Sequence, residues 1–209
     1  GEFGEGKMSS PRQIYEYLKN YFNKKNLVKK KKWKAIVTTG PTREYIDTIR
    51  YISNESSGKQ GYEIAIALNK LGIKTTLIAG PSNLILPEDL DVKKITSADE
   101  MLNEVKKSLP VDLAVCAAAV VDYKPAEKSK NKIKKENRNL KFINLIKNND
   151  ILEYIAKNNK HRPRLVAGFS VETENLLKNS INKMKSKHCD LMIANDVSQK
   201  DIGFNSEYN

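Results

Sequence analysis

The amino-acid sequence predicts an α/β fold, namely a Rossmann-like three-layer α/β/α sandwich with a mostly parallel sheet. Three observations lead to this prediction. From residue 33 onward, short apolar runs of strand length alternate with segments of helical periodicity. Residues 112–121 are apolar almost throughout, which is typical of a strand buried on both faces. The chain has 209 residues, enough for one such domain with a complete core and right-handed crossovers.

The first 32 residues precede this pattern and are predicted to lie apart from a domain at residues 33–209. Residues 1–10 are rich in glycine and lack apolar periodicity. Residues 11–22 carry apolar side chains at helical spacing behind a Ser-Ser-Pro start signal, which predicts a helix. Residues 23–32 are expected to form a basic linker.

Within the domain, residues 34–39 predict the first strand, and a long polar loop follows it to about Gly58. Ser97 and Glu100, three residues apart, predict a capping box at a helix start. The other helices are expected at residues 60–71, 97–108, 150–156 and 174–187, and the other strands at 74–79, 112–121, 141–146, 165–169 and 191–194. Ligands of such a sheet bind at the carboxyl ends of its strands.

The charge balance points to an anionic ligand. There are 37 Lys and Arg residues against 25 Asp and Glu, a formal net charge of +12. Such an excess attracts nucleic acid, a membrane surface or phosphorylated small molecules. Proteins that recognise nucleic-acid bases interleave basic residues with exposed aromatic ones. Here the lysines are scattered and the aromatic residues lie at apolar spacing. We therefore expect no nucleic-acid partner, with a basic nucleic-acid-binding module as an alternative.

Other residue patterns predict a cytoplasmic protein without membrane contact. No apolar run approaches the roughly 18 residues of a membrane helix, and no secretory signal is visible. Cys116 and Cys189 lie in apolar segments without CxxC spacing, so we expect two core thiols rather than a disulfide. His161 and His188 have no partner at metal-ligand spacing, and no metal site on the protein is expected.

The most distinctive loop is the stretch from Ser53 to Gly61, which reads Ser-Asn-Glu-Ser-Ser-Gly-Lys-Gln-Gly and leads directly into a helix. Such a turn aims backbone N–H groups at an anion, so either it binds phosphate or it serves only as a helix cap. It is not a Walker A loop, because Gln60 replaces the required Ser or Thr. No GxGxxG motif follows the first strand, which disfavours a nicotinamide-dependent oxidoreductase, the other alternative on this fold.

Two further candidate segments lie at the end of the strand predicted at residues 112–121 and beyond it. The small residues at 117–119 leave room for a flat ligand, and Asp122 either accepts a hydrogen bond from it or simply caps the strand. The basic loop at residues 128–138 either closes over phosphates or is a solvated surface loop.

Two more loops follow the later strands. Phe169 either stacks on a base or fills the core, and Asn195 and Asp196 either hold a hydroxyl group or magnesium or end the last strand.

Taken in order, these loops resemble the phosphopantothenoylcysteine synthetase family over residues 34–209. The most specific element is the stretch TTGPTREYIDTIRYISNESSGKQG at residues 38–61. Supporting motifs are AAAVVDY, KIKK, IKNNDIL, GFSVET, and ANDVS followed by GFNS. The family usually continues beyond GFNS, so a carboxyl-terminal truncation of this chain is expected.

The resemblance implies a ligase of coenzyme A biosynthesis that uses CTP and Mg²⁺ as bacterial members do, whereas eukaryotic relatives use ATP. The carboxylate of 4′-phosphopantothenate attacks the α-phosphate and releases pyrophosphate, and the amine of cysteine then displaces CMP from the acyl-cytidylate. The resemblance also implies roles for single residues. Asn54 and Lys132 would be catalytic, with Asn54 also holding the substrate. Nucleotide or phosphate binding would fall to Gly40, Ser56, Ser57, Gly58, Lys59, Ala118, Asp122, Lys132 and Phe169, and substrate binding also to Ala118 and Ala119.

The resemblance further implies partners. Residues 1–8 resemble the glycine-rich tail of the flavoprotein phosphopantothenoylcysteine decarboxylase, unless they are a cloning remnant. The native protein would then carry a decarboxylase domain in cis, and FMN would belong only to that absent part. Family members pair as homodimers through strands inserted in this domain, and part of each active site crosses to the second subunit.

Overall fold

The computed structural model describes residues 10–24, 33–134, 142–172 and 174–196, and it confirms the predicted Rossmann-like fold. Its described part contains a six-stranded parallel sheet of order β10-β9-β6-β1-β4-β5. These strands are β1 (Lys34–Thr39), β4 (Lys74–Ala79), β5 (Asp91–Lys94), β6 (Leu113–Cys116), β9 (Leu165–Glu172) and β10 (Leu191–Asp196). Numbered along the chain, this is the doubly wound order 3-2-1-4-5-6, whose direction of winding reverses between β1 and β6.

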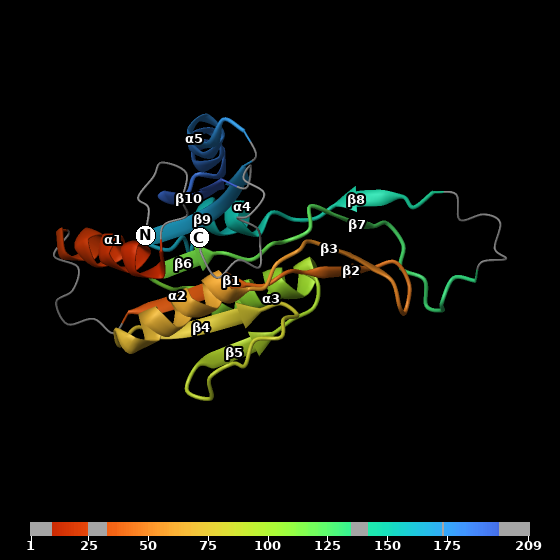
Figure 1. Ribbon diagram of the computed structural model, residues 1–209, viewed down its shortest axis with the longest axis horizontal. Coiled ribbons are helices and arrows are strands. Elements are labelled where there is room, and N and C mark those ends of the chain that lie inside the picture. Colours follow the sequence, from red (N-terminus) through yellow and green to blue (C-terminus); the bar gives the residue numbers. More distant parts are fainter. Residues whose placement is uncertain (1–9, 25–32, 135–141, 173, 197–209) are drawn as a thin grey trace.

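Helices cover both faces of the sheet, because successive residues of a buried strand point to opposite sides. On β1, Val37 packs with the apolar residues of α1 (Pro11–Lys24) and α2 (Lys59–Lys70). Its neighbour Ile36 packs with α3 (Ala98–Ser108) and α4 (Ile151–Ala156), and Met184 of α5 (Leu176–Lys187) joins that same cluster. Figure 1 shows the resulting three layers.

The first helix belongs to this packing. Ile14 and Leu18 of α1 are buried in the same apolar cluster as α2 and β1. The division of the chain at residue 32 stays a prediction, and residues 1–9 and 25–32 lie outside the described part.

The start of α3 has one of the two hydrogen bonds of the predicted capping box, and the second is displaced by one residue. Ser97 accepts a hydrogen bond from the backbone N–H of Glu100 at 3.2 Å. The Glu100 carboxylate accepts from the N–H of Thr96 at 2.7 Å, one residue earlier than a capping box requires. Glu44, from a distant segment, accepts the N–H of Ala98 at 2.8 Å and completes the cap.

Two predicted strands were wrong in extent or place. The strand expected at residues 112–121 ends at Cys116, because beyond it the chain bonds along the end of β1 instead of continuing the ladder. The strand expected at 141–146 is β8 (Leu145–Lys147), which pairs with β7 (Tyr123–Pro125) outside the main sheet. Its apolar residues are exposed rather than buried; Phe142 just before it is 85% exposed.

The loop predicted as polar also contains a hairpin, formed by β2 (Arg43–Tyr45) and β3 (Tyr51–Ser53). β2 packs against β7, so the two antiparallel ribbons form one projection, which we term the arm. Figure 1 shows the arm reaching out to one side of the sheet.

Candidate functional site

The loops after β1 and β6 meet at the switch point of the sheet. Pro41 and Ala119 form an isolated parallel bridge, and the N–H of Ala119 donates to the carbonyl of Gly40 at 2.9 Å. The N–H of Ala118 lies 3.4 Å from the hydroxyl of Thr38. The structure therefore brings Gly40, Ala118 and Ala119 together, as predicted for the carboxyl edge.

The loop leading into α2 lies directly against the end of β1. The hydroxyl of Thr39 donates to the carbonyl of Gly58 at 2.5 Å. Gly58 has a φ of +75°, and a Cβ placed on it would lie 3.0 Å from the Cα of Gly40. A Cβ on Gly61 would lie 2.6 Å from the Thr39 hydroxyl oxygen. Both glycines are needed for this close approach.

The start of α2 is suited to an anion. Gly58 offers no side-chain cap, and the first turn of the helix has no acidic residue. The hydroxyls of Ser56 and Ser57 accept the N–H groups of Gly58 and Lys59 at 3.3 Å each, and the Lys59 side chain is exposed. Positive helix-end charge, hydroxyls and a lysine therefore converge on one loop.

The sequence gives no sign of a functional role for Gln60, which only excludes a Walker A motif. Its side-chain nitrogen is buried and has no hydrogen-bond partner among the described residues. A buried amide without a partner is costly, so a polar ligand atom beside the α2 start would satisfy it.

Asn54 directly follows β3 and connects the hairpin to the switch point. Its side-chain amide donates to the carbonyl of Val120 at 3.0 Å and lies 3.4 Å from that of Ala119. Asn54 is otherwise exposed. It is thus anchored beside the small residues that follow β6.

Asp122 and Phe169 flank this edge. Asp122 is exposed, and its backbone carbonyl accepts the N–H of Asn148 at 2.8 Å. Phe169 lies on β9, next to β6, and packs half-buried against the apolar cluster of that face. Phe169 therefore fills core on one side, and part of its surface stays exposed.

A polar cluster near α4 was not identified from the sequence, although the IKNNDIL motif contains it. Asn148 is buried, donates to the carbonyl of Val121 at 2.8 Å, and has a side-chain oxygen without a partner among the described residues. Asp150 caps α4 by accepting the N–H of Glu153 at 2.8 Å. Lys187 bridges Asp150 and Glu153 at 2.7 and 3.0 Å.

These contacts change the acidity of the cluster. Hydrogen bonds from Lys157 and Lys187 lower the pKa of Glu153 to about 2. Burial opposes the charged form of Lys187, but its hydrogen bonds to Asp150 and Glu153 raise its pKa overall.

Lys132 is not at the switch point of its own chain. It lies in the loop that follows β7, next to Ile133, whose backbone contacts the turn between β2 and β3. Its side chain is exposed and forms no ion pair with a described residue. Residues 135–138 of the predicted basic loop lie outside the described part.

Asn195 and Asp196 lie at the carboxyl end of β10. Asn195 has a buried side-chain oxygen without a partner in the described residues, and Asp196 ends the strand. The described residues include no group of three or more His, Cys, Asp or Glu side chains able to hold a metal. None of the described helices is long and apolar enough to cross a membrane.

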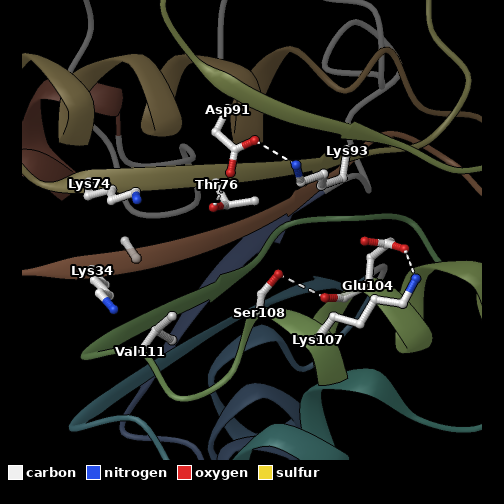
Figure 2. Close-up of a pocket in the computed structure, with 10 residues that line it drawn as sticks. Lys34, Lys74, Thr76, Asp91, Lys93, Glu104, Lys107, Ser108 and Val111 are labelled. Atoms are coloured by element: carbon white, nitrogen blue, oxygen red, sulfur yellow. Dashed lines mark hydrogen bonds and ion pairs between the residues drawn. The ribbon is translucent and has the colours of Figure 1, made fainter.

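A pocket of about 360 Å³ lies at the opposite, amino edge of the sheet, where β1 and β4 begin (Figure 2). Lys34 and Lys74 line it, while Asp91 and Glu104 are paired with Lys93 and Lys107 at 2.9 and 2.6 Å. It is remote from the switch point, and its carboxylates already have partners. We therefore place the candidate site at the carboxyl edge, because of the polar groups that meet there and not because of the volume of a cavity.

Comparison with known proteins identifies the family of the chain. Residues 30–209 match the family model described as DNA/pantothenate metabolism flavoprotein C-terminal domain. The bifunctional coenzyme A biosynthesis protein CoaBC of Haemophilus influenzae is 40% identical over 210 residues, an alignment that covers 100% of this chain and 51% of that protein. The chain therefore spans about half the length of the curated relatives it matches.

Solved structures show the same fold. The crystal structure of the C-terminal domain of a CoaBC protein aligns with a TM-score of 0.68 and 33% identity, covering 78% of this chain and 77% of that one. A Cab2 H337A variant in complex with phosphopantothenate-cysteine aligns with a TM-score of 0.64 and covers 93% of this chain and 82% of that one. Its 16% identity supports similarity of fold alone.

Proposed function

Since this chain belongs to the family of the C-terminal domain of DNA/pantothenate metabolism flavoproteins, we propose that it joins 4′-phosphopantothenate to cysteine in coenzyme A biosynthesis. The observation that carries the proposal is that the start of α2, where Gly58 supplies no side-chain cap, meets Asn54 and Ala118–Ala119 at the switch point. This arrangement suits a triphosphate beside a reacting carboxyl group. The name of the Haemophilus influenzae relative supports the pathway.

The reaction would run in two balanced steps with CTP as co-substrate. The carboxylate of 4′-phosphopantothenate attacks the α-phosphorus, the bond to the β-phosphate oxygen breaks, and pyrophosphate leaves. The cysteine amine then attacks the acyl carbon of the acyl-cytidylate, and CMP leaves as the amide forms and the amine loses a proton. Neither step needs an enzyme nucleophile, because positioning and charge stabilisation are sufficient for such transfers.

Different segments of the site would bind the phosphates, the acyl group and Mg²⁺. The N–H groups at the start of α2, with Ser56, Ser57 and Lys59, would bind phosphate oxygens. Asn54 would hold the acyl group at the end of β6. Mg²⁺ would arrive with the nucleotide and be held mainly by its phosphates, which is how this ion usually binds at such sites.

The preference for CTP would depend on the surface near Ala118, Asp122 and Phe169. Ala118 presents only a methyl group, which leaves space for a flat base. The exposed Asp122 carboxylate can accept from the amino group of cytosine, and Phe169 offers a partly exposed ring.

The arm supports a homodimer as the working form. Its exposed apolar side chains gather on the two ribbons; they are Ile49, Tyr51, Tyr123, Phe142, Ile143, Leu145 and Ile146. A second copy of the arm would remove this apolar surface from water. Lys132 lies in the arm beyond β7, whereas Asn54 is at the base of the hairpin, so Lys132 of one subunit would serve the site of the other.

Two variants test this shared site. Lys132→Gln and Asn54→Asp should each lose most pyrophosphate release, Lys132→Gln by roughly 10²-fold because one charge-stabilising donor is lost. When both are co-expressed, half of the dimers would carry both variants, and each mixed dimer would have one intact site. Recovery of about one quarter of the wild-type rate is therefore expected. A mixture as inactive as its components would refute the shared site.

We further propose that a flavin-dependent decarboxylase domain accompanies this chain in cis, as the name of the bifunctional relative suggests, and that the protein is cytoplasmic. Thermal shifts test ligand choice first. Because a ligand that binds the folded state stabilises it, CTP with Mg²⁺ should raise the Tm of the protein, whereas ATP and NADPH should not. A rise with NADPH alone would overturn the ligase proposal in favour of an oxidoreductase.

A further inference from the structure

Asp47 is a fully buried carboxylate with no part in the proposed chemistry. It lies in the turn between β2 and β3, and its side chain has 0% exposure. One carboxylate oxygen accepts the N–H groups of Ile49 and Arg50 at 2.8 Å each. These two bonds are those of an ordinary turn closed by an aspartate. If Asp47 made no other hydrogen bonds, these two would give it a purely local structural role.

The second carboxylate oxygen reaches a different part of the chain. It accepts the backbone N–H of Ile133 at 3.1 Å, across 86 positions of sequence. It also accepts the Arg50 guanidinium at 2.6 and 3.0 Å, and that guanidinium donates to the Ile133 carbonyl at 2.7 Å. Asp47 and Arg50 therefore hold both polar groups of one residue in the loop after β7. We term this set of contacts the Asp47 clamp.

The same loop is held at its beginning. The N–H of Ser129 donates to the carbonyl of Ile46 at 2.9 Å, and the Lys128 ammonium lies 4.9 Å from the centre of the Tyr45 ring. Lys132 stands between these attachments and immediately before Ile133. Its backbone is thus fixed from both sides, while its side chain is exposed and forms no ion pair with the described residues.

We propose that Asp47 is a positioning residue for the reaction: it fixes the peptide that follows Lys132 so that the Lys132 ammonium meets the reacting phosphates at a defined place. The inference rests on the proposed function, because the role of Lys132 is part of it. A lysine on a held backbone loses less conformational freedom when it engages the transition state than one on a free loop. Asp47 itself touches no substrate.

The Asp47 clamp keeps its carboxylate charged. Backbone N–H groups of Arg50 and Ile49, with the Arg50 guanidinium and the Ile133 N–H, hold the pKa of Asp47 well below its ordinary value despite its burial. The carboxylate therefore stays ionised throughout the physiological pH range and accepts all its donors. The clamp is accordingly not expected to act as a pH switch.

Asp47→Asn tests the proposal in the full-length protein with little change of shape. The amide has one oxygen where the carboxylate had two, so it cannot accept all the present donors. We expect kcat for pyrophosphate release to fall roughly 10- to 100-fold, because small misplacements of a catalytic group cost this much. The KM for CTP should stay within about twofold, since the triphosphate loop at α2 is untouched.

A double variant distinguishes positioning from general damage. If Asp47 acts through Lys132, Asp47→Asn should add no further loss to Lys132→Gln, so the double variant should match Lys132→Gln within about twofold. The matched control is Asp91→Asn, the same chemical change at a hydrogen-bonded carboxylate on the amino edge of the sheet, which should keep full activity. Circular dichroism and Tm report on folding in each case.

Several outcomes would overturn the inference. Normal kcat in Asp47→Asn alongside an impaired Lys132→Gln would refute the clamp and leave the ligase proposal standing. Multiplying losses in the double variant would mean that Asp47 acts by another route. Near-normal turnover of Lys132→Gln would instead refute the role of Lys132, and the clamp with it. If Asp47→Asn does not fold, Arg50→Lys replaces it: loss of the bond to the Ile133 carbonyl should lower kcat, and unchanged kcat would contradict the proposal.

Discussion

Two glycines at opposite ends of α2 share a left-handed backbone but differ in what surrounds them. Gly58 has a φ of +75° and Gly72 a φ of +77°. A Cβ on Gly58 would lie 3.0 Å from the Cα and 3.1 Å from the nitrogen of Gly40, whereas a Cβ on Gly72 would meet nothing within 4 Å. Alanine at either position therefore costs similar backbone strain, about 1 kcal/mol after the loss of unfolded-state entropy is included.

Only Gly58→Ala adds a collision with backbone atoms. Because carbon atoms prefer separations of roughly 3.5–4.0 Å, relieving this contact should cost about a further 2 kcal/mol. In a chain of 209 residues, about 1 kcal/mol corresponds to roughly 2–4 °C in Tm. Thermal melting should therefore place Gly58→Ala roughly 4–8 °C below Gly72→Ala.

The same pair tests the phosphate loop. Any relief of the contact moves the start of α2 away from β1, so isothermal titration should show CTP binding at least about tenfold weaker for Gly58→Ala, a loss of about 1.4 kcal/mol. Gly72→Ala should bind CTP as the wild type does. Equal melting temperatures for the two variants would refute the contact argument. Full CTP affinity in a destabilised Gly58→Ala would show that phosphate does not bind at this loop.

Three other predictions concern single side chains. Because hydrogen bonds lower the pKa of Glu153 from 4.5 to about 2, its contribution to stability is present above about pH 4.5 and lost as pH falls toward 2; Glu153→Gln should flatten the Tm profile over that window. Desolvation raises the pKa of the half-buried Cys116 thiol to about 12, so iodoacetamide should not label it in the folded protein at pH 8, and rapid labelling would contradict the raised pKa. Phe169→Leu should raise the KM for CTP roughly fivefold through lost stacking, and an unchanged KM would assign Phe169 to the core alone.

The main sheet and the meeting of loops at its carboxyl edge could be predicted, because they depend on local pattern and on one topological rule. The runs at residues 34–39 and 74–79 are apolar and β-branched, and they form β1 and β4 with the predicted bounds. Parallel strands share an edge at their carboxyl ends, so loops far apart in sequence were expected to meet there. Gly40 and Ala119 do so.

The arm could not be predicted, because its stabilising contacts are not local. β2 and β3 are three residues each, and their turn is closed by the Asp47 side chain rather than by glycine or proline. β8 belongs to a segment whose apolar residues indicate a core strand, but the structure leaves them exposed. Local pattern cannot distinguish burial in the same chain from burial against another copy.

The location of Lys132 shows the same limit. The basic composition of residues 128–138 allows either a loop that closes over phosphates or a solvated surface loop. The direction of the loop depends on the bond between Ile133 and Asp47, 86 positions away. Similarly, β5 has the charged sequence Asp-Val-Lys-Lys and pairs only at the edge of the sheet, so no apolar run indicates it.

The most direct test of the proposed ligase is pyrophosphate release from CTP by the full-length protein, measured with and without each co-substrate. We expect that release requires 4′-phosphopantothenate, proceeds without cysteine until the sites are filled with acyl-cytidylate, and becomes continuous, with matching release of CMP, once cysteine is added. Release that is independent of 4′-phosphopantothenate, or none at all with CTP and Mg²⁺ present, would contradict the assignment of this site to phosphopantothenate–cysteine ligation.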